Sequence, residues 1–241
     1  MTRIYQNILS QIESGQSLLA ILIDPDKTSN IENAVISGIN NSIATHIFVG
    51  GSDVKADATE LLVKELKSKT NLPVVLFPGD VSQLTHEADG LLFLSLISGR
   101  NPDYLIGQHV KAVSKLNGHQ MEVIPTGYLL IENGKETAVE RVTGTKPLPR
   151  QDFQTIIDTA VAGELLGLKM IYLEAGSGAQ TAVDTILINR VRKAISIPLI
   201  VGGGFRDKAQ ILAAYEAGAN MVVVGTAIEK DPDFLNDLKR Q

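Results

Sequence analysis

The chain of 241 residues contains no cysteine and no tryptophan, and aromatic residues make up only 5% of it. Without cysteine it has no disulfides, thiolate metal sites or cysteine nucleophile, as is common in a reducing compartment. Its most apolar runs, residues 18–23 and 91–97, are strand-sized and well short of the roughly 18 residues of a membrane-spanning helix. The N-terminus has the polar interruptions of an amphipathic helix and lacks the apolar core of a signal peptide. We therefore expect a cytoplasmic protein.

An excess of positive charge is also missing. The sequence has 22 Lys plus Arg against 27 Asp plus Glu, a formal net charge of -5. Sites that follow a nucleic-acid backbone usually show clustered basic residues, so nucleic acid is not expected as a partner. With 44% hydrophobic and 20% charged residues, the composition is that of a globular protein with a large core.

Short apolar runs rich in β-forming residues recur along the whole chain. Apolar character that is nearly unbroken is typical of parallel strands covered on both faces. Eight such runs are present, at residues 18–24, 46–51, 73–79, 90–98, 121–131, 170–176, 198–204 and 221–227. Helix-like stretches separate most of them, at residues 30–40, 56–68, 103–116, 152–166, 181–194 and 208–217. This alternation predicts a (β/α)8 TIM barrel in a single domain of residues 1–241.

Two segments break the alternation. Residues 81–88 are too few for a full outer helix, so the third crossover is expected to be shortened or displaced. Residues 132–150 mix Gly, Pro, Thr and charged residues after the fifth strand, where active-site lids often lie. We expect this second segment to be a mobile loop.

Glycines cluster where the last two predicted strands end. Gly202, Gly203 and Gly204 follow the seventh strand and precede a helix, and Gly225 and Thr226 follow the eighth. Glycine lets backbone N–H groups approach an anion closely, and a helix N-terminus adds partial positive charge. Because TIM barrels commonly bind phosphate between these two loops, we predict a phosphate site here. Glycines that merely permit tight turns would give the same pattern.

A carboxylate lies close to this predicted site. In the stretch YLEAGSGA, Tyr172 and Glu174 are two residues apart on one face of a strand end, and Ser177 and Gly178 are in the following turn. Next to a phosphate, a carboxylate is well placed to hold a substrate hydroxyl and accept its proton. Glu174 is the candidate base, and a structural ion pair with a neighbouring Lys or Arg is the alternative.

The first predicted strand ends in the motif IDPDK. Asp24 is directed to the same mouth of the barrel, whereas Asp26 has the position of a helix cap. Carboxylate and hydroxyl oxygens are ligands that suit Mg2+, and Ser52 follows the neighbouring strand. The spacing is equally compatible with a metal ligand and with a hydrogen-bonded structural Asp24.

Taken in order, the motifs IDPDK, VGGSD, YLEAGSGA, VGGGFRD and VGTA resemble those of the geranylgeranylglyceryl phosphate synthases, to which the bacterial heptaprenylglyceryl phosphate synthases are related. The resemblance covers essentially the whole chain. Residues 95–107 resemble the larger, second subgroup, in which geranylgeranyl diphosphate is the usual donor. The family has a modified barrel with a displaced third helix, in agreement with the short piece at residues 81–88.

The resemblance implies transfer of a prenyl group from an allylic diphosphate to the C3 hydroxyl of sn-glycerol 1-phosphate, with release of diphosphate. It implies that phosphate is held by Gly203, Gly204, Gly225 and Thr226. The glycerol part would lie along Tyr172, Leu173, Glu174, Ala175, Gly176, Ser177 and Gly178. Catalysis would fall to Glu174 and Tyr172, and Mg2+ would bind to Asp24 and Ser52. It also implies a homo-oligomer, dimer or hexamer, and the lipid substrate suggests transient contact with the membrane surface.

Two other readings remain open. The first is another phosphate-binding TIM-barrel enzyme acting on a small sugar or glycerol phosphate, which would need neither metal nor a prenyl groove. The second is a non-enzymatic phosphate-ligand binder, which would have no reason to place Glu174 opposite the phosphate. An aldolase has little support, because Lys27 is the only lysine close to a predicted strand end and lies in a loop.

Overall fold

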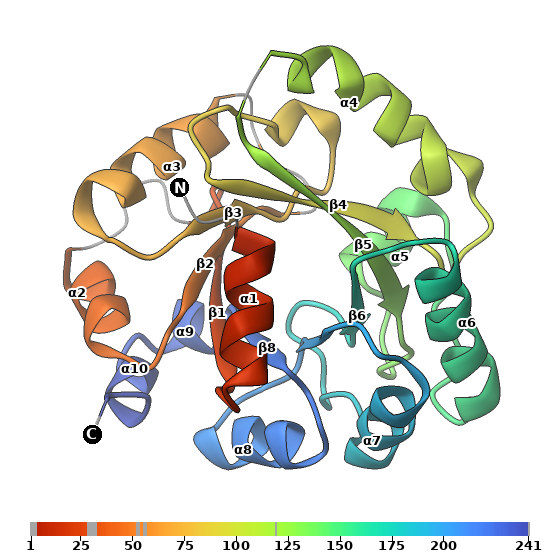
Figure 1. Cartoon of the computed structure of the whole chain (residues 1–241). Helices are drawn as coiled ribbons and strands as arrows, with labels where there is room; N and C mark the ends of the chain where they lie inside the picture. Colours follow the sequence, from red (N-terminus) through yellow and green to blue (C-terminus); the bar gives the residue numbers. More distant parts are fainter. Residues whose placement is uncertain (1–3, 28–32, 52–53, 55–56, 119, 241) are drawn as a thin grey trace.

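In the computed structural model, which describes residues 4–27, 33–51, 54, 57–118 and 120–240, eight parallel strands close into one barrel in chain order (Figure 1). The strands are β1 (Leu18–Ile23), β2 (His46–Val49), β3 (Val74–Leu76), β4 (Gly90–Leu96), β5 (Glu122–Leu130), β6 (Met170–Glu174), β7 (Leu199–Gly202) and β8 (Met221–Val224). The ring closes where Leu18 of β1 pairs with Met221 of β8. The predicted TIM barrel is confirmed.

Helices surround the barrel and cover its N-terminal end. They are α1 (Ile4–Glu13), α2 (Asn33–Asn41), α3 (Ala58–Lys69), α4 (Gln108–Leu116), α5 (Ala138–Thr143), α6 (Phe153–Leu165), α7 (Thr185–Ala194), α8 (Lys208–Glu216), α9 (Thr226–Lys230) and α10 (Phe234–Asp237). Three of the outer helices begin at an aspartate whose side chain accepts a backbone N–H of the first turn: Asp152, Asp184 and Asp207. None of the described helices is long and apolar enough to cross a membrane.

Apolar side chains form two separate layers. Alternate residues of each strand point inward or outward, so that Leu173 packs between the sheet and the helices while Tyr172 packs inside the barrel. The amphipathic helix α1 was predicted, and it lies across the barrel opening in Figure 1. Its Ile4 and Ile8 join the interior layer together with Leu18. The N-terminal end of the barrel is therefore closed, and the open end is the one where the strands finish.

The third crossover has no outer α-helix. Between β3 and β4 the chain forms a single 3-10 turn, η1 (Val81–Gln83), which begins where the Asp80 carboxylate accepts the backbone N–H of Ser82. The predicted shortening of the third helix is confirmed. After β4 a π-helical turn, η2 (Asp103–Gly107), leads directly into α4.

The prediction that residues 132–150 form only a loop is wrong. This segment contains α5, whose N-cap Thr137 accepts the backbone N–H of Glu140, and Leu148 pairs with Ile131 in a short parallel bridge. Val139 packs against the apolar layer inside the barrel, so α5 lies over the barrel mouth. The low apolar content of the segment hid a helix that is fixed by a cap and by one buried contact.

Candidate active site

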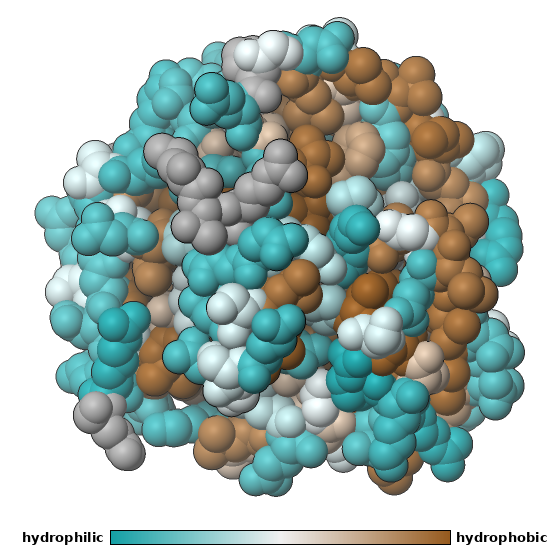
Figure 2. All heavy atoms as spheres, viewed as in Figure 1, coloured by the Kyte–Doolittle hydropathy of each residue, from teal (hydrophilic) through white to brown (hydrophobic). Residues whose placement is uncertain are grey.

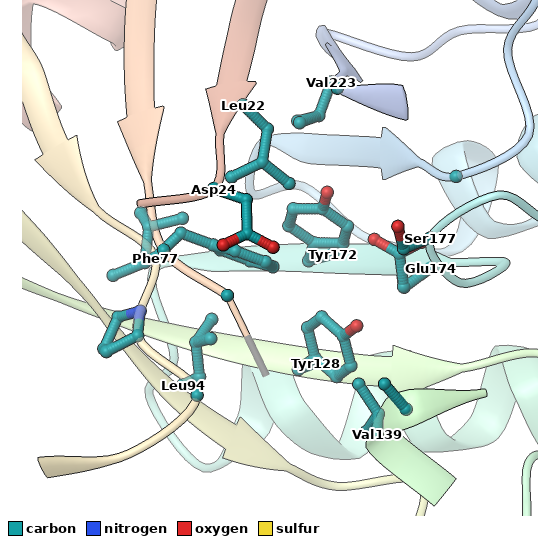
Figure 3. A pocket seen from close by; sticks show the side chains of 18 of the residues that line it. Leu22, Asp24, Phe77, Leu94, Tyr128, Val139, Tyr172, Glu174, Ser177 and Val223 are labelled. Carbon is teal, nitrogen blue, oxygen red and sulfur yellow. The ribbon is translucent and has the colours of Figure 1, made fainter. Parts of the chain in front are cut away.

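A cavity of about 800 Å³ opens at the C-terminal ends of the strands. Figure 3 shows Asp24, Tyr128, Tyr172 and Glu174 directed into it, Asp24 from the end of β1, Tyr128 from β5 and the other two from β6. The structure brings together nine of the predicted site residues on its wall: Asp24, Tyr172, Glu174, Ser177, Gly178, Gly203, Gly204, Gly225 and Thr226. The predicted metal ligand Ser52 lies outside the described residues.

Three predicted glycerol contacts are not on this wall. Leu173 and Ala175 point the other way and are buried in the layer between sheet and helices. Gly176 takes part through its backbone, because its N–H donates to Oε1 of Glu174 at 2.5 Å. The alternation of side chains along β6 explains this division, since every second residue faces the helices.

The carboxylate of Glu174 is held in a buried, mostly apolar environment. Its side chain is only 6% exposed. Burial raises its pKa to about 7, against the opposing effects of the Gly176 N–H and the nearby Tyr172 hydroxyl. The Tyr172 oxygen itself has no hydrogen-bond partner of standard geometry within the described residues. A carboxyl group that titrates near neutral pH is suited to accept a proton from a substrate hydroxyl.

Glycines at the end of β7 and just after it make room for this carboxylate. A Cβ on Gly203 would lie 2.3 Å from Oε1 of Glu174, so close that the carboxylate would have to move. Gly203 and Gly204 also have positive φ angles of 83° and 79°, which favour glycine. Gly203 therefore serves two purposes, since it admits the Glu174 side chain and exposes backbone to the cavity.

Two hydroxyl groups meet across the predicted phosphate site. Oγ of Ser177 and Oγ1 of Thr226 are 3.1 Å apart, which brings the loops after β6 and β8 together. Thr226 is the first residue of α9, which has no side-chain cap. The first N–H groups of such a helix lack partners within the helix and can bind an anion.

The two helices that follow the predicted phosphate loops differ at their N-termini. The helix after the three glycines, α8, begins only at Lys208, and the Asp207 carboxylate accepts the N–H of Gln210 there. The helix α9 has no side-chain cap, and its first residue, Thr226, lines the cavity.

Asp24 lies on the opposite side of the cavity from Ser177 in Figure 3. Its Oδ1 accepts the backbone N–H of Asp26 at 3.1 Å, and its Oδ2 is 3.3 Å from Nζ of Lys27. Lys27 is also 3.0 Å from the carboxylate of Glu229 on α9. Although burial alone would lower the pKa of Lys27, the hydrogen bond and negative charge of Glu229 raise it.

The donors around Asp24 fit a hard cation that brings part of its own shell. Within the described residues no three His, Cys, Asp or Glu side chains come close enough together to form a metal site. Mg2+ usually keeps several waters and binds through one or two carboxylates plus substrate phosphates. Gly51 provides space at Asp24, because a Cβ there would lie 2.7 Å from Oδ1. A single carboxylate on the cavity wall is compatible with Mg2+ that is shared with a diphosphate.

Three aromatic rings form the centre of the cavity. The ring centroids of Phe77 and Tyr172 are 5.2 Å apart, those of Tyr128 and Tyr172 are 5.3 Å apart, and those of Phe77 and Tyr128 are 6.0 Å apart. Burial and the nearby Glu174 charge raise the pKa of both tyrosines, so they keep their protons. The faces of such rings attract positive charge.

An apolar arm of the cavity extends away from the polar site toward α4. Tyr104 and Tyr128 both line the cavity. The arm continues past η1, and its far end is lined by Leu84, Phe93, His109 and Ala112. The Val139 side of α5 forms a further wall. The arm exists because no outer helix fills the space beside β4.

Sequence reasoning missed the partners of Lys27 and the role of His109. Lys27 and Glu229 are far apart in sequence, so no local pattern links them. His109 has no motif around it in the sequence, but it is buried in the arm, with Nε2 3.1 Å from Oγ of Ser95 and its ring edge-on to Phe93. Burial lowers the pKa of His109, so it is neutral at physiological pH.

Comparison with known proteins bears on this arrangement. A model of the PcrB family matches residues 12–240. The chain belongs to the PcrB family. A curated relative from Flavobacterium johnsoniae, named geranylgeranylglyceryl phosphate synthase, is 53% identical over 98% of both chains. The predicted resemblance of this PcrB family protein to the geranylgeranylglyceryl phosphate synthases is confirmed.

Solved structures agree with the fold of this PcrB family protein. (S)-3-O-geranylgeranylglyceryl phosphate synthase from Thermoplasma acidophilum, crystallised with its substrate sn-glycerol-1-phosphate, superposes with a TM-score of 0.90 at 31% identity and covers 99% of this chain and 96% of its own. Thiamine phosphate pyrophosphorylase from Pyrococcus furiosus superposes with a TM-score of 0.56 at 11% identity. The second similarity concerns the fold alone.

Proposed function

We propose that this protein is a prenyltransferase that joins the C3 hydroxyl of sn-glycerol 1-phosphate to an allylic prenyl diphosphate, with geranylgeranyl diphosphate as the preferred donor. The observation that carries the proposal is a single cavity that unites a glycine-lined anion site, a buried carboxylate and an apolar arm. Another phosphate-binding TIM-barrel enzyme acting on a small phosphate ester would have no use for the apolar arm. The relatives named geranylgeranylglyceryl phosphate synthase support the same assignment.

The glycerol phosphate binds with its phosphate between Gly204 and Thr226 and its C3 hydroxyl toward Glu174. The hydroxyl oxygen attacks C1 of the prenyl chain as the bond from C1 to the diphosphate oxygen breaks, and diphosphate leaves with the electron pair. The proton of the hydroxyl passes to the Glu174 carboxylate, which the Gly176 N–H holds in place. Positioning contributes strongly, because a neutral hydroxyl is a weak nucleophile.

Positive charge develops on the allylic carbon as diphosphate departs. The faces of Phe77, Tyr128 and Tyr172 line the route between the apolar arm and Glu174 and are suited to stabilise that charge. Burial of Tyr128 and Tyr172 keeps water away from the cation, so that the glycerol hydroxyl captures it.

Mg2+ is the proposed cofactor. Asp24, with Ser52 as the predicted second ligand, would hold it, and Mg2+ supplies charge neutralisation for the leaving diphosphate when bound. We expect Asp24→Asn to weaken Mg2+ binding by about tenfold and to reduce turnover, as a carboxylate ligand is lost. Calorimetric titration of Mg2+ in the presence of inorganic diphosphate measures this. Asp26→Asn is the control, and equal affinities in all three proteins would contradict the assignment.

The reaction itself is tested with purified protein, sn-glycerol 1-phosphate, Mg2+ and a series of prenyl diphosphates, with mass spectrometry to detect the ether. We expect product from the 1-phosphate, little from sn-glycerol 3-phosphate, and none in EDTA. The highest kcat/KM identifies the donor length. If no donor yields an ether although glycerol phosphate binds, a different phosphate-ester enzyme is the better description.

A homo-oligomer is the proposed assembly. Ile106, Val110 and Val113 are 60%, 66% and 51% exposed, and their spacing puts them on one face of η2 and α4. Figure 2 shows hydrophobic surface over this part of the molecule, at the upper right. Burial against a second copy would remove these side chains from water. Analytical ultracentrifugation of Val110→Lys and Val113→Lys variants tests this, and wild-type sedimentation as a monomer would contradict it.

Transient contact with a membrane surface and a cytoplasmic location remain predictions.

A further inference from the structure

The ammonium group of Lys135, from the segment between β5 and α5, lies beside Gly178 at the edge of the predicted phosphate site. A Cβ on Gly178 would lie 3.6 Å from Nζ of Lys135 and 3.8 Å from Cγ2 of Thr226. Ser177, next to Gly178, contacts Thr226 through its hydroxyl. The lysine nitrogen therefore shares the surroundings of Gly178 with the two hydroxyl groups that flank the anion site.

The backbone that carries Lys135 is held firmly on both sides. Asn133 is buried, and its side-chain amide donates to the carbonyl oxygen of Ala175 while its Oδ1 accepts the N–H of Lys135 at 3.3 Å. Thr137 is also buried and caps α5. Both side chains press on Gly176, where a Cβ would lie 2.6 Å from Cγ2 of Thr137 and 3.1 Å from Nδ2 of Asn133. These contacts fix the segment against the turn that follows β6.

Three cations lie beside the turn after β6, and two of them hydrogen-bond to it. Arg150 donates to Oγ1 of Thr181 at 2.5 Å and to the carbonyl oxygen of Ala182 at 2.9 Å. Arg206, which also lines the cavity, donates to the carbonyl oxygen of Ala179 at 3.2 Å. Lys135 forms no side-chain hydrogen bond or ion pair with any residue that the structure describes. Its ammonium can therefore meet a ligand without giving up a protein partner among those residues.

The anion site needs such a charge. A phosphate monoester carries about -1.5 to -2 at neutral pH, and Glu174 lies against Gly203 on the same wall. Backbone N–H groups alone leave this accumulation of negative charge uncompensated. We propose that Lys135 is a further substrate-binding residue that pairs with the phosphate of the glycerol substrate and holds it against Ser177 and Thr226. The proposal rests on the proposed function, because it assigns a residue to the same site.

Lys135→Met removes the charge and keeps the length of the side chain. By isothermal titration with sn-glycerol 1-phosphate and no prenyl donor, we expect its Kd to rise about tenfold over wild type. With donor present, KM for glycerol phosphate should rise while kcat at saturation changes less than twofold. Lys135→Arg should restore most of the affinity. The affinity of the Met variant should also depend less steeply on ionic strength, because one charge pair is lost.

Lys146→Met is the matched control. Lys146 is on the same segment, but its side chain is 87% exposed and pairs with Glu140 at 2.7 Å. We expect wild-type affinity in this variant. Unchanged Kd in folded Lys135→Met, or an equal loss in both variants, would overturn the role of Lys135 and leave the proposed function intact. If wild-type protein does not bind sn-glycerol 1-phosphate, the role of Lys135 and the proposed function are both contradicted.

Discussion

A Cβ on Gly202 would lie 2.1 Å from the hydroxyl oxygen of Tyr172 and 2.9 Å from Oε2 of Glu174. Gly202 is the last residue of β7 and is fully paired in the barrel, as is its neighbour on β6. Neither strand can move aside without breaking the ladder. The positions of the phenol and the carboxylate thus depend on the absence of a side chain on the adjacent strand.

Gly202→Ala is expected to displace Tyr172 and Glu174 and to reduce kcat by tenfold or more, with a loss of about 1–3 kcal/mol in stability from overpacking. Gly167→Ala is the control, because Gly167 has a φ of 89° and open space around its Cβ position. That change should cost about 1 kcal/mol without altering kcat. Steady-state kinetics and thermal unfolding separate the two effects, and a Gly202→Ala enzyme with wild-type kcat would refute the dependence.

Activity should follow the ionisation of Glu174. Because burial raises its pKa to about 7, the carboxylate form that accepts the proton increases as the pH rises through 7. We expect kcat at saturating substrates to rise over roughly pH 6–8 and then to level off. Glu174→Gln should lower kcat by at least a hundredfold and abolish this limb. If kcat of the Gln variant rose with pH as it does in wild type, the rise would belong to another titrating group.

The free energy of unfolding should fall as the pH rises, whereas activity should rise. The folded-state pKa of Glu174, about 7, is above its ordinary value of 4.5, so the native state binds more protons than the unfolded state between these values. The contribution to stability is complete below pH 4.5 and is lost as the pH rises through 7, with a total of roughly 3 kcal/mol. Denaturant unfolding at pH 5 and pH 8, compared between wild type and Glu174→Gln, measures this. Between pH 5 and pH 8 the free energy of unfolding should fall more in wild type than in Glu174→Gln. An equal change in the two proteins would refute the assignment.

Donor length should depend on the far end of the apolar arm. Ala112 is buried in α4 and lines the cavity there, so Ala112→Phe should shorten the arm. We expect the ratio of kcat/KM for the twenty-carbon donor to that for the fifteen-carbon donor to fall by about tenfold or more. Ser114→Phe, on the exposed side of the same helix, should leave the ratio unchanged. Product ratios from mixed donors, measured by mass spectrometry, provide the test.

The sequence was sufficient to predict the barrel, because buried parallel strands are nearly continuous apolar runs and because the short piece after β3 is visible as a missing helix. It also predicted the strand ends that carry Asp24, Glu174 and Thr226, since in a barrel all strand ends share one face. Because side chains alternate between the two faces of a strand, the sequence also placed Tyr172 and Glu174 on the same face of β6. Residue type and position along an element were enough for these inferences.

Contacts between distant segments could not be predicted in this way. The ion pair of Lys27 with Glu229 and the approach of Lys135 to Gly178 depend on how loops from different strands are placed. The helix α5 had a local signal, because Thr137 and Glu140 have the spacing of a capping box before Val142 and its neighbours. Composition outweighed that signal, since Gly, Pro, Thr and charged residues make up most of residues 132–150.

The turn η1 has a consequence for how the interior of the molecule is divided. In a barrel with a complete ring of helices, the axial interior and the layer between sheet and helices are separate compartments. Here the cavity wall includes Leu92 and Leu94, which face the axis, and Leu91 and Phe93, which face outward. The two compartments are joined over the rim of β3 and β4. One amphiphilic molecule can thus keep its charged end on the barrel axis and its hydrocarbon end outside the sheet.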